Sequence, residues 1–543
     1  MKNIIYNLET KVERTLNILK NNIMKIKFIP ILIILFLLQA CTLEKEEFNK
    51  ITPENFYKTE KDARLAIAAL YYNSITKVGT WSPGLFVQSI NSVQIITDIS
   101  AGDMMMCSYG AQPWDFLKNQ EWTESNGYAT NNFFHYYNHI SNARLVANQI
   151  GQMTTVSEEM KEQLQAEAMA VGGWKAAILY DLYGPVPYPT DEMLANPGSL
   201  EYPERPSNEA FVEIIESLFA KKDKLPDTDF GNNFGRMNKG IANFILMRVY
   251  MLEAARTGDA NFWKKAKTSA EAIIASGAYE LQDNYSDVFK KSNQKNNEIV
   301  FATPSDYSFN VNMWHSESLP NNYPSELNRG AGSWGGYKML WSFYDTYEAN
   351  DQRLSTIAAS YTTDGGLLID RAHPNDDRHG VGDGAIPVKY DTDDTQVGNF
   401  QEHDFIAYRY AEVILAMAEI LNEIGESATV SAPAISQITN DNQIVTSDGG
   451  TTAFSFVNAI RARSGLQPLQ GLGQSQLRDA ILRERGHEMY CEGVRRADLI
   501  RYQRMTNGGG YAKFNADPNK FLFPIPVGYI NEYKGNLQQN PGY

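Results

Sequence analysis

Apolar residues recur at helical spacing along a long stretch in the first half of the chain. Between about Asn131 and Gly277 they predict successive amphipathic helices joined by short polar segments. We expect these helices at 131–153, 157–183, 207–222, 239–255 and 262–276. Small residues fall where neighbouring helices must approach closely, and large residues fill the space between them. This is the pattern of tetratricopeptide-like helix pairs, so a mostly α-helical scaffold is predicted.

The helical pattern stops after this stretch and returns at Asp404. Residues 279–400 are crowded with Gly, Pro, Asn and Asp and keep many aromatic side chains, which favours a functional loop region over a linker. Within it we expect a helix at 337–348 and a strand at 385–390. A helix is predicted from Asp404 to Ile424, with Gly425 as its stop. Further helices are expected at 453–464 and 475–505, with a polar insertion at 429–452.

A short basic segment, an apolar run and a small residue before a cysteine stand near the beginning of the sequence. The apolar run, Phe28 to Leu38, is shorter than the roughly 20 residues that a membrane-spanning helix needs. Together with Ala40 and Cys41 it is typical of a lipoprotein signal, in which Cys41 becomes the lipid-bearing first residue. We therefore expect a signal peptide at 1–40 (with Met24 as an alternative start), a lipidated tether at 41–50 and a single helical domain at 51–543.

Removal of residues 1–40 changes the charge of the chain. It leaves 43 Lys and Arg against 62 Asp and Glu, a net charge of −19. Such an acidic protein is repelled by phosphate backbones, so no nucleic-acid partner is expected. Apart from Cys41, only Cys107 and Cys491 remain, and two thiols so far apart do not make a disulfide framework.

The sequence carries few signals for catalysis or for metal binding. It contains no Gly-x-Ser-x-Gly elbow, phosphate loop or Cys/His nucleophile pair. His135 and His139 lie four apart on a predicted helix, but Tyr136 stands where a zinc protease needs glutamate, so a surface or partly packed histidine pair is favoured over a metal site. Abundant carboxylates leave a glycosidase pair open, although nothing singles out an acid and a base.

One acidic segment has part of the spacing of a calcium loop. Asp391, Asp393, Thr395 and Glu402 supply oxygen ligands, but Gln396 stands where the tight turn needs glycine. We expect no cofactor, with a structural calcium ion as the alternative.

Several motifs in the last third of the sequence point to a known family. They are DFIAYRYAEVIL at 404–415, FVNAIRARSGL at 456–466, the charged run within 484–499, FPIP at 523–526 and QNPGY at 539–543; DLYGPVP at 181–187 matches upstream. In this order the motifs resemble the SusD/RagB family of outer-membrane nutrient-binding lipoproteins of Bacteroidetes. The resemblance spans nearly the whole mature chain and implies a SusD-like fold.

The charged run in these motifs also has a purely structural interpretation. Its members are spaced by three and four residues, so that they can pair with one another and with neighbouring helices: Glu484, Arg485, Glu488, Glu492, Arg495, Arg496 and Asp498. We expect a structural ion-pair network here, with a catalytic carboxylate pair as the alternative.

Candidate ligand contacts come from aromatic and polar residues in two variable regions, 77–122 and 279–336. Pyranose rings have apolar faces and polar edges, and flat indole rings surrounded by amide and charged groups suit them. The predicted ligand-binding residues are Trp81, Asp98, Trp114, Tyr307, Asn310, Trp314, His315 and Trp334. Each tryptophan taken singly could also be a core residue.

The resemblance completes the functional hypothesis. It implies a lipid-anchored, surface-exposed outer-membrane protein that captures glycan oligomers and delivers them to a SusC-like TonB-dependent transporter, without being an enzyme. The acidic residues Glu44, Glu46 and Glu47 resemble the signal that marks such lipoproteins for the outer surface. The alternatives are a peptide-binding lid of the same type, a glycan-cleaving enzyme and a surface adhesin.

Overall fold

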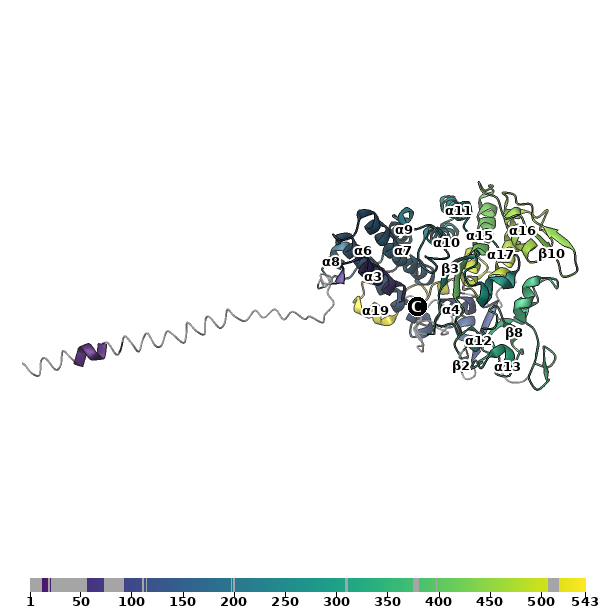
Figure 1. Ribbon diagram of the computed structural model, residues 1–543, viewed down its shortest axis with the longest axis horizontal. Helices are drawn as coiled ribbons and strands as arrows, with labels where there is room; N and C mark the ends of the chain where they lie inside the picture. The colour runs from purple at the N-terminus through teal and green to yellow at the C-terminus, as the bar shows by residue number, and fades with distance from the viewer. Residues whose placement is uncertain are drawn as a thin grey trace, which may run out of the picture. The chain divides into compact units, whose positions relative to one another are not determined.

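The computed structural model of the chain divides into two compact units, Met1–Phe56 and Tyr57–Tyr543. It describes residues 12–17, 20, 56–72, 92–109, 112–113, 115–196, 198, 201–307, 311–374, 380–396, 398–505 and 517–543. Cys41 and its acidic tether lie outside these residues. The second unit contains the helices and loops of interest (Figure 1).

Antiparallel helix pairs form the scaffold of this second unit. α6 (Gly127–Gln152) packs on α7 (Glu158–Tyr183), α10 (Lys239–Thr257) on α11 (Ala260–Ala275), and α15 (Tyr410–Ile424) on α16 (Ala453–Arg463). α3 (Glu60–Tyr72) and α9 (Asn208–Leu218) cover α7. Gly172 permits the close approach of α6 and α7, because an added Cβ atom would lie 2.8 Å from that of Ala143. The predicted helix-pair scaffold is confirmed.

Helix ends follow the capping residues of the sequence. Ser157 caps α7 by accepting a hydrogen bond from the backbone N–H of Met160, and Asn238 caps α10 in the same way through Ile241. Gly425 ends α15 in the left-handed conformation that a residue with a side chain adopts only at a cost. The five helices predicted between residues 131 and 277 are all present, with ends shifted by at most four residues.

Four predictions in the second half of the chain were wrong in part. Residues 405–409 form a strand, β9 (Phe405–Arg409), which pairs with β3 (Ile299–Thr303) before α15 begins. Residues 337–344 divide into β4 (Tyr337–Leu340) and α14 (Trp341–Tyr344). The insertion at 429–452 contains a hairpin, β10 (Ser436–Ile438) and β11 (Ile444–Thr446). The last predicted helix is broken into α17 (Gln474–Glu488) and α18 (Arg495–Arg501), because Cys491 and Gly493 take positive φ angles of 60° and 74°.

A small antiparallel sheet lies beside the scaffold. Its strand order is β2-β1-β4-β8-β5, with β1 (Met105–Tyr109), β2 (Gln112–Pro113), β5 (Ile357–Ala358) and β8 (Gly384–Pro387). A separate hairpin joins β6 (Tyr361–Thr362) and β7 (Leu368–Ile369). The remaining α-helices are α4 (Val93–Ser100), α5 (Asp115–Lys118), α8 (Asp191–Ala195), α12 (Trp314–Ser318), α13 (Ser325–Asn328) and α19 (Val527–Glu532). Short 3₁₀ helices occur at Lys222–Lys224, Tyr285–Phe289, Lys291–Asn293, Gln352–Thr356 and Pro518–Lys520.

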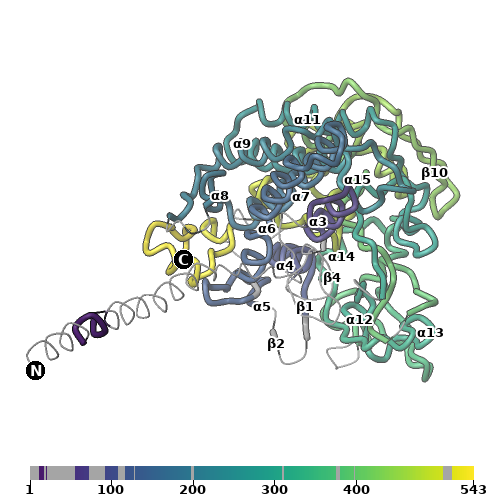
Figure 2. The backbone as a smooth tube through the Cα atoms, turned by 60° about the vertical axis from the view of Figure 1, so that its left-hand side comes forward, coloured from purple at the N-terminus to yellow at the C-terminus, as the bar shows by residue number. Residues whose placement is uncertain are grey.

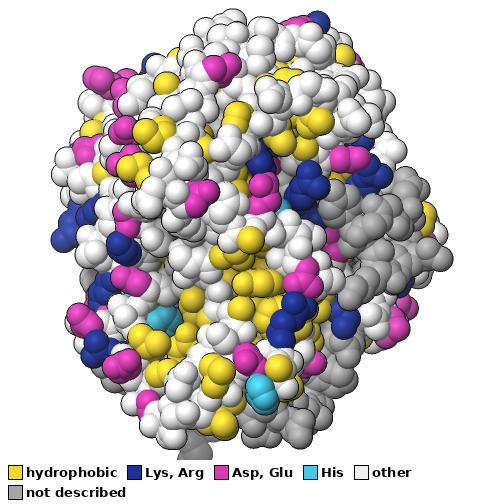
Figure 3. Space-filling model, turned by 90° about the vertical axis from the view of Figure 1, so that its right-hand side faces the viewer, with side chains coloured by type: hydrophobic (Ala, Val, Ile, Leu, Met, Phe, Trp, Pro, Cys, Tyr) yellow, Lys and Arg dark blue, Asp and Glu magenta, His cyan; other side chains and the backbone are white. Residues whose placement is uncertain are grey.

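The core is continuous through the helix pairs and extends into the sheet. A second, smaller core of Leu319, Tyr323, Tyr361, Ile369, Val381 and Ile386 supports the region around α12 and α13. Figures 1 and 2 both place α12 and α13 together, away from α9 and α11. Figure 3 views the molecule from the side of β10 and α13, where hydrophobic side chains gather between charged ones. The loops of the predicted ligand region therefore have their own supporting core.

Candidate functional site

Three loop segments that are far apart in the sequence are tied together near α12. We call residues 304–307, 328–334, 393–396 and 398–399 the loop cluster. Residues 393–396 contact both of the other segments. The hydroxyl of Tyr307 donates to the carbonyl oxygen of Thr395, and Arg329 Nη2 lies 2.6 Å from Asp394 Oδ1. On the same side, Gln396 Nε2 donates to the carbonyl of Asn328 at 2.9 Å. These bonds bring aromatic and polar side chains from three segments onto one surface.

Residues of α12 form hydrogen bonds with the loop cluster. The backbone N–H of Trp334 donates to the carbonyl of Ser316 at 2.7 Å, and Ser316 Oγ donates to the carbonyl of Asn399 at 3.1 Å. His315 is buried and accepts at Nδ1 from Gln401 Nε2 at 2.7 Å, so that its Nε2–H donates to the carbonyl of Tyr390 at 3.1 Å. Burial lowers the pKa of His315 to about 4, which keeps the ring neutral, as this bonding pattern requires.

A lysine ammonium occupies the acidic segment that has calcium-like spacing. Lys291 Nζ contacts the buried carboxylate of Asp393 and the hydroxyl of Thr395, and lies 3.7 Å from Glu402. Burial alone would raise the pKa of Asp393, but hydrogen bonds from Lys291 and from the backbone of Glu402 and Thr395 lower it to about 2. The described residues contain no group of three or more His, Cys, Asp or Glu side chains arranged to hold a metal ion. The segment thus works as a lysine-centred clamp under the loop cluster.

Two of the predicted ligand-binding residues lie in the loop cluster with partly exposed side chains. They are Tyr307 and Trp334, and the loop cluster also contains the charged pair of Arg329 and Asp394. Asp394 is exposed over 85% of its side chain and Arg329 over 43%, so both remain accessible to a ligand. Trp81, Trp114 and Asn310, like Cys41, lie outside the described residues.

The other three predicted residues are interior, which corrects the expectation that they lie on an exposed face. Trp314 is fully buried: its ring packs edge-on against Tyr337 at 5.7 Å between centroids, and its Nε1 donates to the carbonyl of Pro387 at 3.1 Å. His315 supports the loops as described above. No ring face or carboxylate of these residues is open to a sugar.

Asp98 is the third interior residue, and it joins α4 to two other elements. Its carboxylate accepts from the hydroxyl of Tyr337 and from the backbone N–H of Gly493, both at 3.1 Å. Burial raises the pKa of Asp98 to about 7, against the lowering effect of these two bonds. Its role in the structure is to connect β4 with the turn after α17.

Sequence reasoning missed the polar members of the loop cluster. Asp394, Gln396 and Asn399 bridge its segments, and Asn399 also accepts from the backbone N–H of Gly332. The sequence signal for them was the density of turn-forming Asp, Asn and Gly residues at 391–399. In the sequence we interpret these residues as part of a possible calcium loop.

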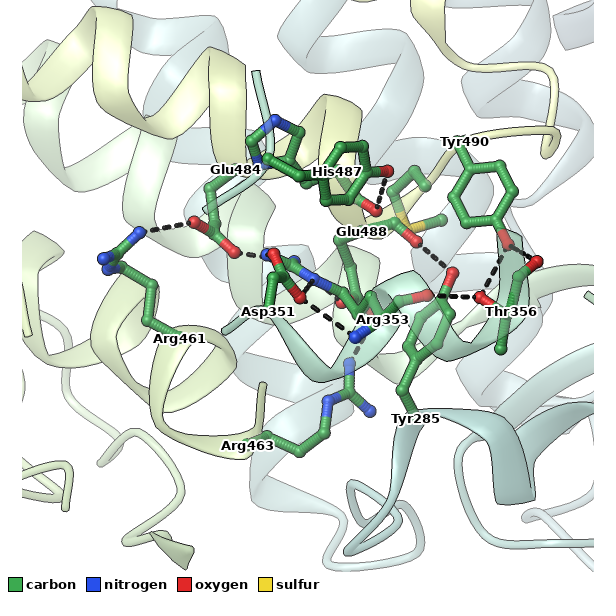
Figure 4. Close-up of polar contacts among 12 residues, drawn as sticks. Tyr285, Asp351, Arg353, Thr356, Arg461, Arg463, Glu484, His487, Glu488 and Tyr490 are labelled. Carbon is green, nitrogen blue, oxygen red and sulfur yellow. Dashed lines mark hydrogen bonds and ion pairs between the residues drawn. The ribbon is translucent and has the colours of Figure 1, made fainter. Parts of the chain in front are cut away.

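Buried arginines and carboxylates hold the C-terminal motifs together. Glu488 lies at the centre, with Arg353 Nη1 at 3.3 Å and Arg463 in closer contact (Figure 4). Arg409 Nη1 lies 3.0 Å from the same carboxylate. Burial would raise the pKa of Glu488, but the three guanidinium groups hold it well below its usual range. Arg353 also makes a paired contact with Asp351 at 2.7 and 2.9 Å. All five side chains are fully or almost fully buried.

The same arrangement continues through the rest of the charged run. Arg485 pairs with Asp498 at 2.9 Å, and Arg495 pairs with Asp103 at 2.7 Å. Glu484 bridges Arg353 at 2.7 Å and Arg461 at 3.1 Å (Figure 4). The predicted structural ion-pair network is confirmed, and its carboxylates are paired with guanidinium groups.

His135 and His139 are neighbours on α6 with ring centroids 5.8 Å apart. Burial lowers the pKa of His135 to about 3 and that of His139 to about 4, so both rings are neutral at pH 7.

In the part of the chain that the structure describes, no helix combines the length and the apolar character needed to cross a membrane.

The scaffold of helix pairs with a small antiparallel sheet is the fold of SusD-like proteins of known structure. One member, surface glycan-binding protein A from Bacteroides thetaiotaomicron in complex with laminarihexaose, superposes with a TM-score of 0.66 at 20% identity, over 88% of this chain and 99% of that chain. The chain belongs to the SusD family: the family model of that description matches residues 297–543, and the model described as "Starch-binding associating with outer membrane" matches residues 56–251.

Two relatives are similar in sequence to this chain at low identity. SusD-like protein P2 of Formosa agariphila is 25% identical over 564 residues, which cover 96% of this chain and 100% of that protein. Starch-binding protein SusD of Bacteroides thetaiotaomicron is 24% identical over 370 residues, which cover 57% of this chain and 61% of that protein.

Proposed function

We propose that this chain is a lipid-anchored protein of the outer-membrane surface that captures glycan oligomers and delivers them to a SusC-like TonB-dependent transporter. The observation that carries the proposal is the loop cluster. It brings together the partly exposed Tyr307 and Trp334 and an accessible guanidinium and carboxylate, those of Arg329 and Asp394. Flat rings suit the apolar faces of a pyranose, and the charged pair suits its hydroxyl edges.

The relatives support a glycan rather than a peptide as ligand. One is named for starch binding, and a solved structure of the same fold holds laminarihexaose. Within the variable regions 77–122 and 279–336, we further propose Trp81, Trp114 and Asn310 as ligand contacts.

Capture on this surface needs no bond-making. The carboxylates of the C-terminal motifs form ion pairs with arginines, and the carboxylate of Asp393 forms an ion pair with Lys291. We therefore propose a binding protein without catalytic activity. Incubating the purified chain with a glycan that it binds, and finding shortened products by chromatography, would overturn this part of the proposal.

The anchor and the transporter complete the proposal. Cys41 would carry the lipid after removal of residues 1–40, and residues 41–50 would form the tether that precedes the helical domain at 51–543. The family model that matches residues 56–251 is described as associated with the outer membrane, which supports this placement. Co-purification of the tagged chain with a β-barrel transporter from detergent-solubilised membranes is the expected result. Isolation of the chain with copies of itself alone would favour an adhesin.

Calorimetric titration with panels of laminari- and malto-oligosaccharides tests the binding site. Covering about 80 Å² of apolar ring surface stabilises a complex by about 2 kcal/mol, so Trp334→Ala should weaken binding about thirtyfold. Tyr307→Ala should also weaken it. Tyr202→Ala is the matched control, because this ring is 39% exposed but packs beside Tyr533, outside the loop cluster.

Three results would decide against the glycan site. Binding of a peptide panel without binding of any glycan would establish the peptide-binding alternative. Unchanged glycan affinity in both loop variants would place the site elsewhere. Equal weakening by Tyr202→Ala would show that the losses are not specific to the loop cluster.

A further inference from the structure

The loop cluster carries a negative charge. It contains three carboxylates, those of Asp306, Asp393 and Asp394, against a single cation, Arg329, so its formal net charge is −2. The ammonium of Lys291, which contacts Asp393 from outside the cluster, reduces this charge only to −1. A ligand that binds to the cluster therefore meets a surface with more negative than positive groups.

Cations are scarce throughout the two variable regions. Residues 77–122 and 279–336 together hold six Lys and Arg against eleven Asp and Glu. The structure describes all four cations of the second region, and three of them contact a carboxylate: Lys290 with Asp287, Lys291 with Asp393, and Arg329 with Asp394. The fourth, Lys295, lies over the ring of Phe234, with Nζ 5.6 Å from its centroid. Positive charge in this region is thus already engaged within the protein.

This distribution of charge matters for sugars that carry sulfate or carboxylate groups. Proteins usually bind such groups through arginine, whose planar guanidinium donates two parallel hydrogen bonds. The one arginine of the loop cluster, Arg329, already has Asp394 as its partner at 2.6 Å. An anionic sugar would have to compete with this carboxylate for the guanidinium, and the two like charges would then repel each other.

An uncharged sugar meets no such conflict. Its hydroxyl groups can donate hydrogen bonds to Asp394, which is exposed over 85% of its side chain, without displacing Arg329. A hydrogen bond from a neutral donor to a carboxylate is stronger than one between two neutral groups. The ion pair also restrains Asp394, so less side-chain freedom is lost when a ligand binds.

We propose that the loop cluster selects uncharged glycans, and that Asp394 is the residue that excludes sulfated and uronate-containing ones. The inference rests on the proposed function and names the substrate class of the same site. Asp394 accepts hydroxyl hydrogen bonds from a neutral oligosaccharide and repels the charged groups of an anionic one. Arg329 holds the carboxylate in place.

Calorimetric titration of the purified chain with two panels of oligosaccharides tests the substrate class. The neutral panel contains laminari-, malto-, xylo- and galacto-oligosaccharides, and the anionic panel contains oligogalacturonate, alginate and sulfated galactan oligosaccharides. The tightest ligand should belong to the neutral panel. A sulfated derivative of that ligand should bind at least about tenfold more weakly in 0.1 M NaCl.

Salt separates repulsion between charges from the bulk of the sulfate group. Raising NaCl from 0.1 to 1 M shortens the Debye length from about 10 Å to about 3 Å. The difference in affinity between the neutral ligand and its sulfated derivative should therefore shrink in 1 M NaCl, whereas a steric barrier would be unaffected by salt.

Asp394→Asn tests the residue itself. It removes the repelling charge and releases Arg329, so affinity for the sulfated derivative should rise about tenfold, or about 1.4 kcal/mol. Affinity for the neutral ligand should stay within about threefold, because the amide oxygen still accepts a hydrogen bond. Asp191→Asn is the matched control: Asp191 on α8 is 83% exposed and also pairs with an arginine, Arg144, but lies outside the loop cluster. This control should leave the discrimination unchanged.

Each other result counts against the proposal. Tighter binding of the anionic panel would refute the substrate class while leaving glycan capture intact. Discrimination that persists in 1 M NaCl or in Asp394→Asn would show that this charge does not exclude anionic sugars. Absence of binding by both panels would remove the proposed function and this inference together.

Discussion

Glu488→Gln is the sharpest perturbation of the buried ion-pair network. It preserves the size of the side chain and removes only the negative charge that faces Arg353, Arg409 and Arg463. All three guanidinium groups stay buried, where water cannot replace the lost partner. We therefore expect a lower free energy of unfolding with little change in the shape of the core.

The magnitude follows from the three contacts. A hydrogen bond to a charged group contributes about 1.5–3 kcal/mol and a neutral one about 1 kcal/mol, so each contact loses about 1 kcal/mol and the set about 3 kcal/mol. This agrees with the lower end of the cost of breaking a buried ion pair. At an unfolding entropy of about 2.1 cal/mol/K per residue, a unit of about 490 residues loses about 3 °C in its midpoint.

Differential scanning calorimetry at pH 7 measures this change. Glu426→Gln is the matched control, because Glu426 pairs with Lys267 at 3.0 Å on the surface with 43% of its side chain exposed. Exposed pairs contribute about 0–1 kcal/mol, so the control should shift the midpoint by less than about 1 °C. A Glu488→Gln midpoint as close to the native one as that of the control would refute the reasoning.

The pH dependence gives a second reading of the same contacts. The pKa of Glu488 is depressed in the folded chain, so its contribution to stability is complete above the unfolded value of 4.5 and is lost as the pH falls below it. The difference between the native chain and Glu488→Gln should therefore shrink in acid. A difference that stays constant from pH 7 into this range would contradict the assignment.

Three further predictions concern single residues. Because the ring of Trp314 lies in the core, Trp314→Ala should lower the free energy of unfolding by about 3–5 kcal/mol. Its glycan affinity, measured below the unfolding transition, should equal that of the native chain. A loss of affinity with an unchanged midpoint would show that the ring contacts the ligand. Burial raises the pKa of Asp98 to about 7, so the native chain should lose stability relative to Asp98→Asn as the pH rises from about 4 to 7, and parallel midpoints in calorimetry would contradict this. Cys41→Ser should move the protein from the membrane to the soluble fraction, and retention in membranes would exclude a lipid on Cys41.

The helix pairs were predictable because their signals are local. α7, α10 and α15 each combine apolar residues at helical spacing with a capping residue or a terminal glycine. Residues 405–409 were assigned to a helix because their apolar run continues into α15. Their strand conformation depends on pairing with β3, about one hundred residues upstream, which no local pattern reports.

The predicted ligand face shows the same limit at the level of side chains. Trp314 and Trp334 lie in the same irregular region, yet the first is fully buried and the second is partly exposed. The packing of Tyr337 and Tyr390 around Trp314 accounts for its burial, and these contacts are not visible in the local sequence. The possible calcium site at 391–402 could not be judged from the local sequence for a related reason. Lys291, whose ammonium group contacts Asp393 there, stands about one hundred residues earlier in the chain.

The buried ion-pair network also imposes an order on folding. Its members reach from Glu298 beside β3, through Arg409 at the end of β9, to Glu488 in α17. The pairs α6/α7 and α10/α11 contact mainly their own neighbours and can form as soon as they emerge, whereas β3 and β9 cannot bury Arg409 until α17 is present. The loop cluster lies between β3 and β9 along the chain, so we expect it to become ordered only after this network has formed. We expect a chain interrupted before Glu488 to form its helix pairs but to lack the network that holds β3, β9 and α17 together.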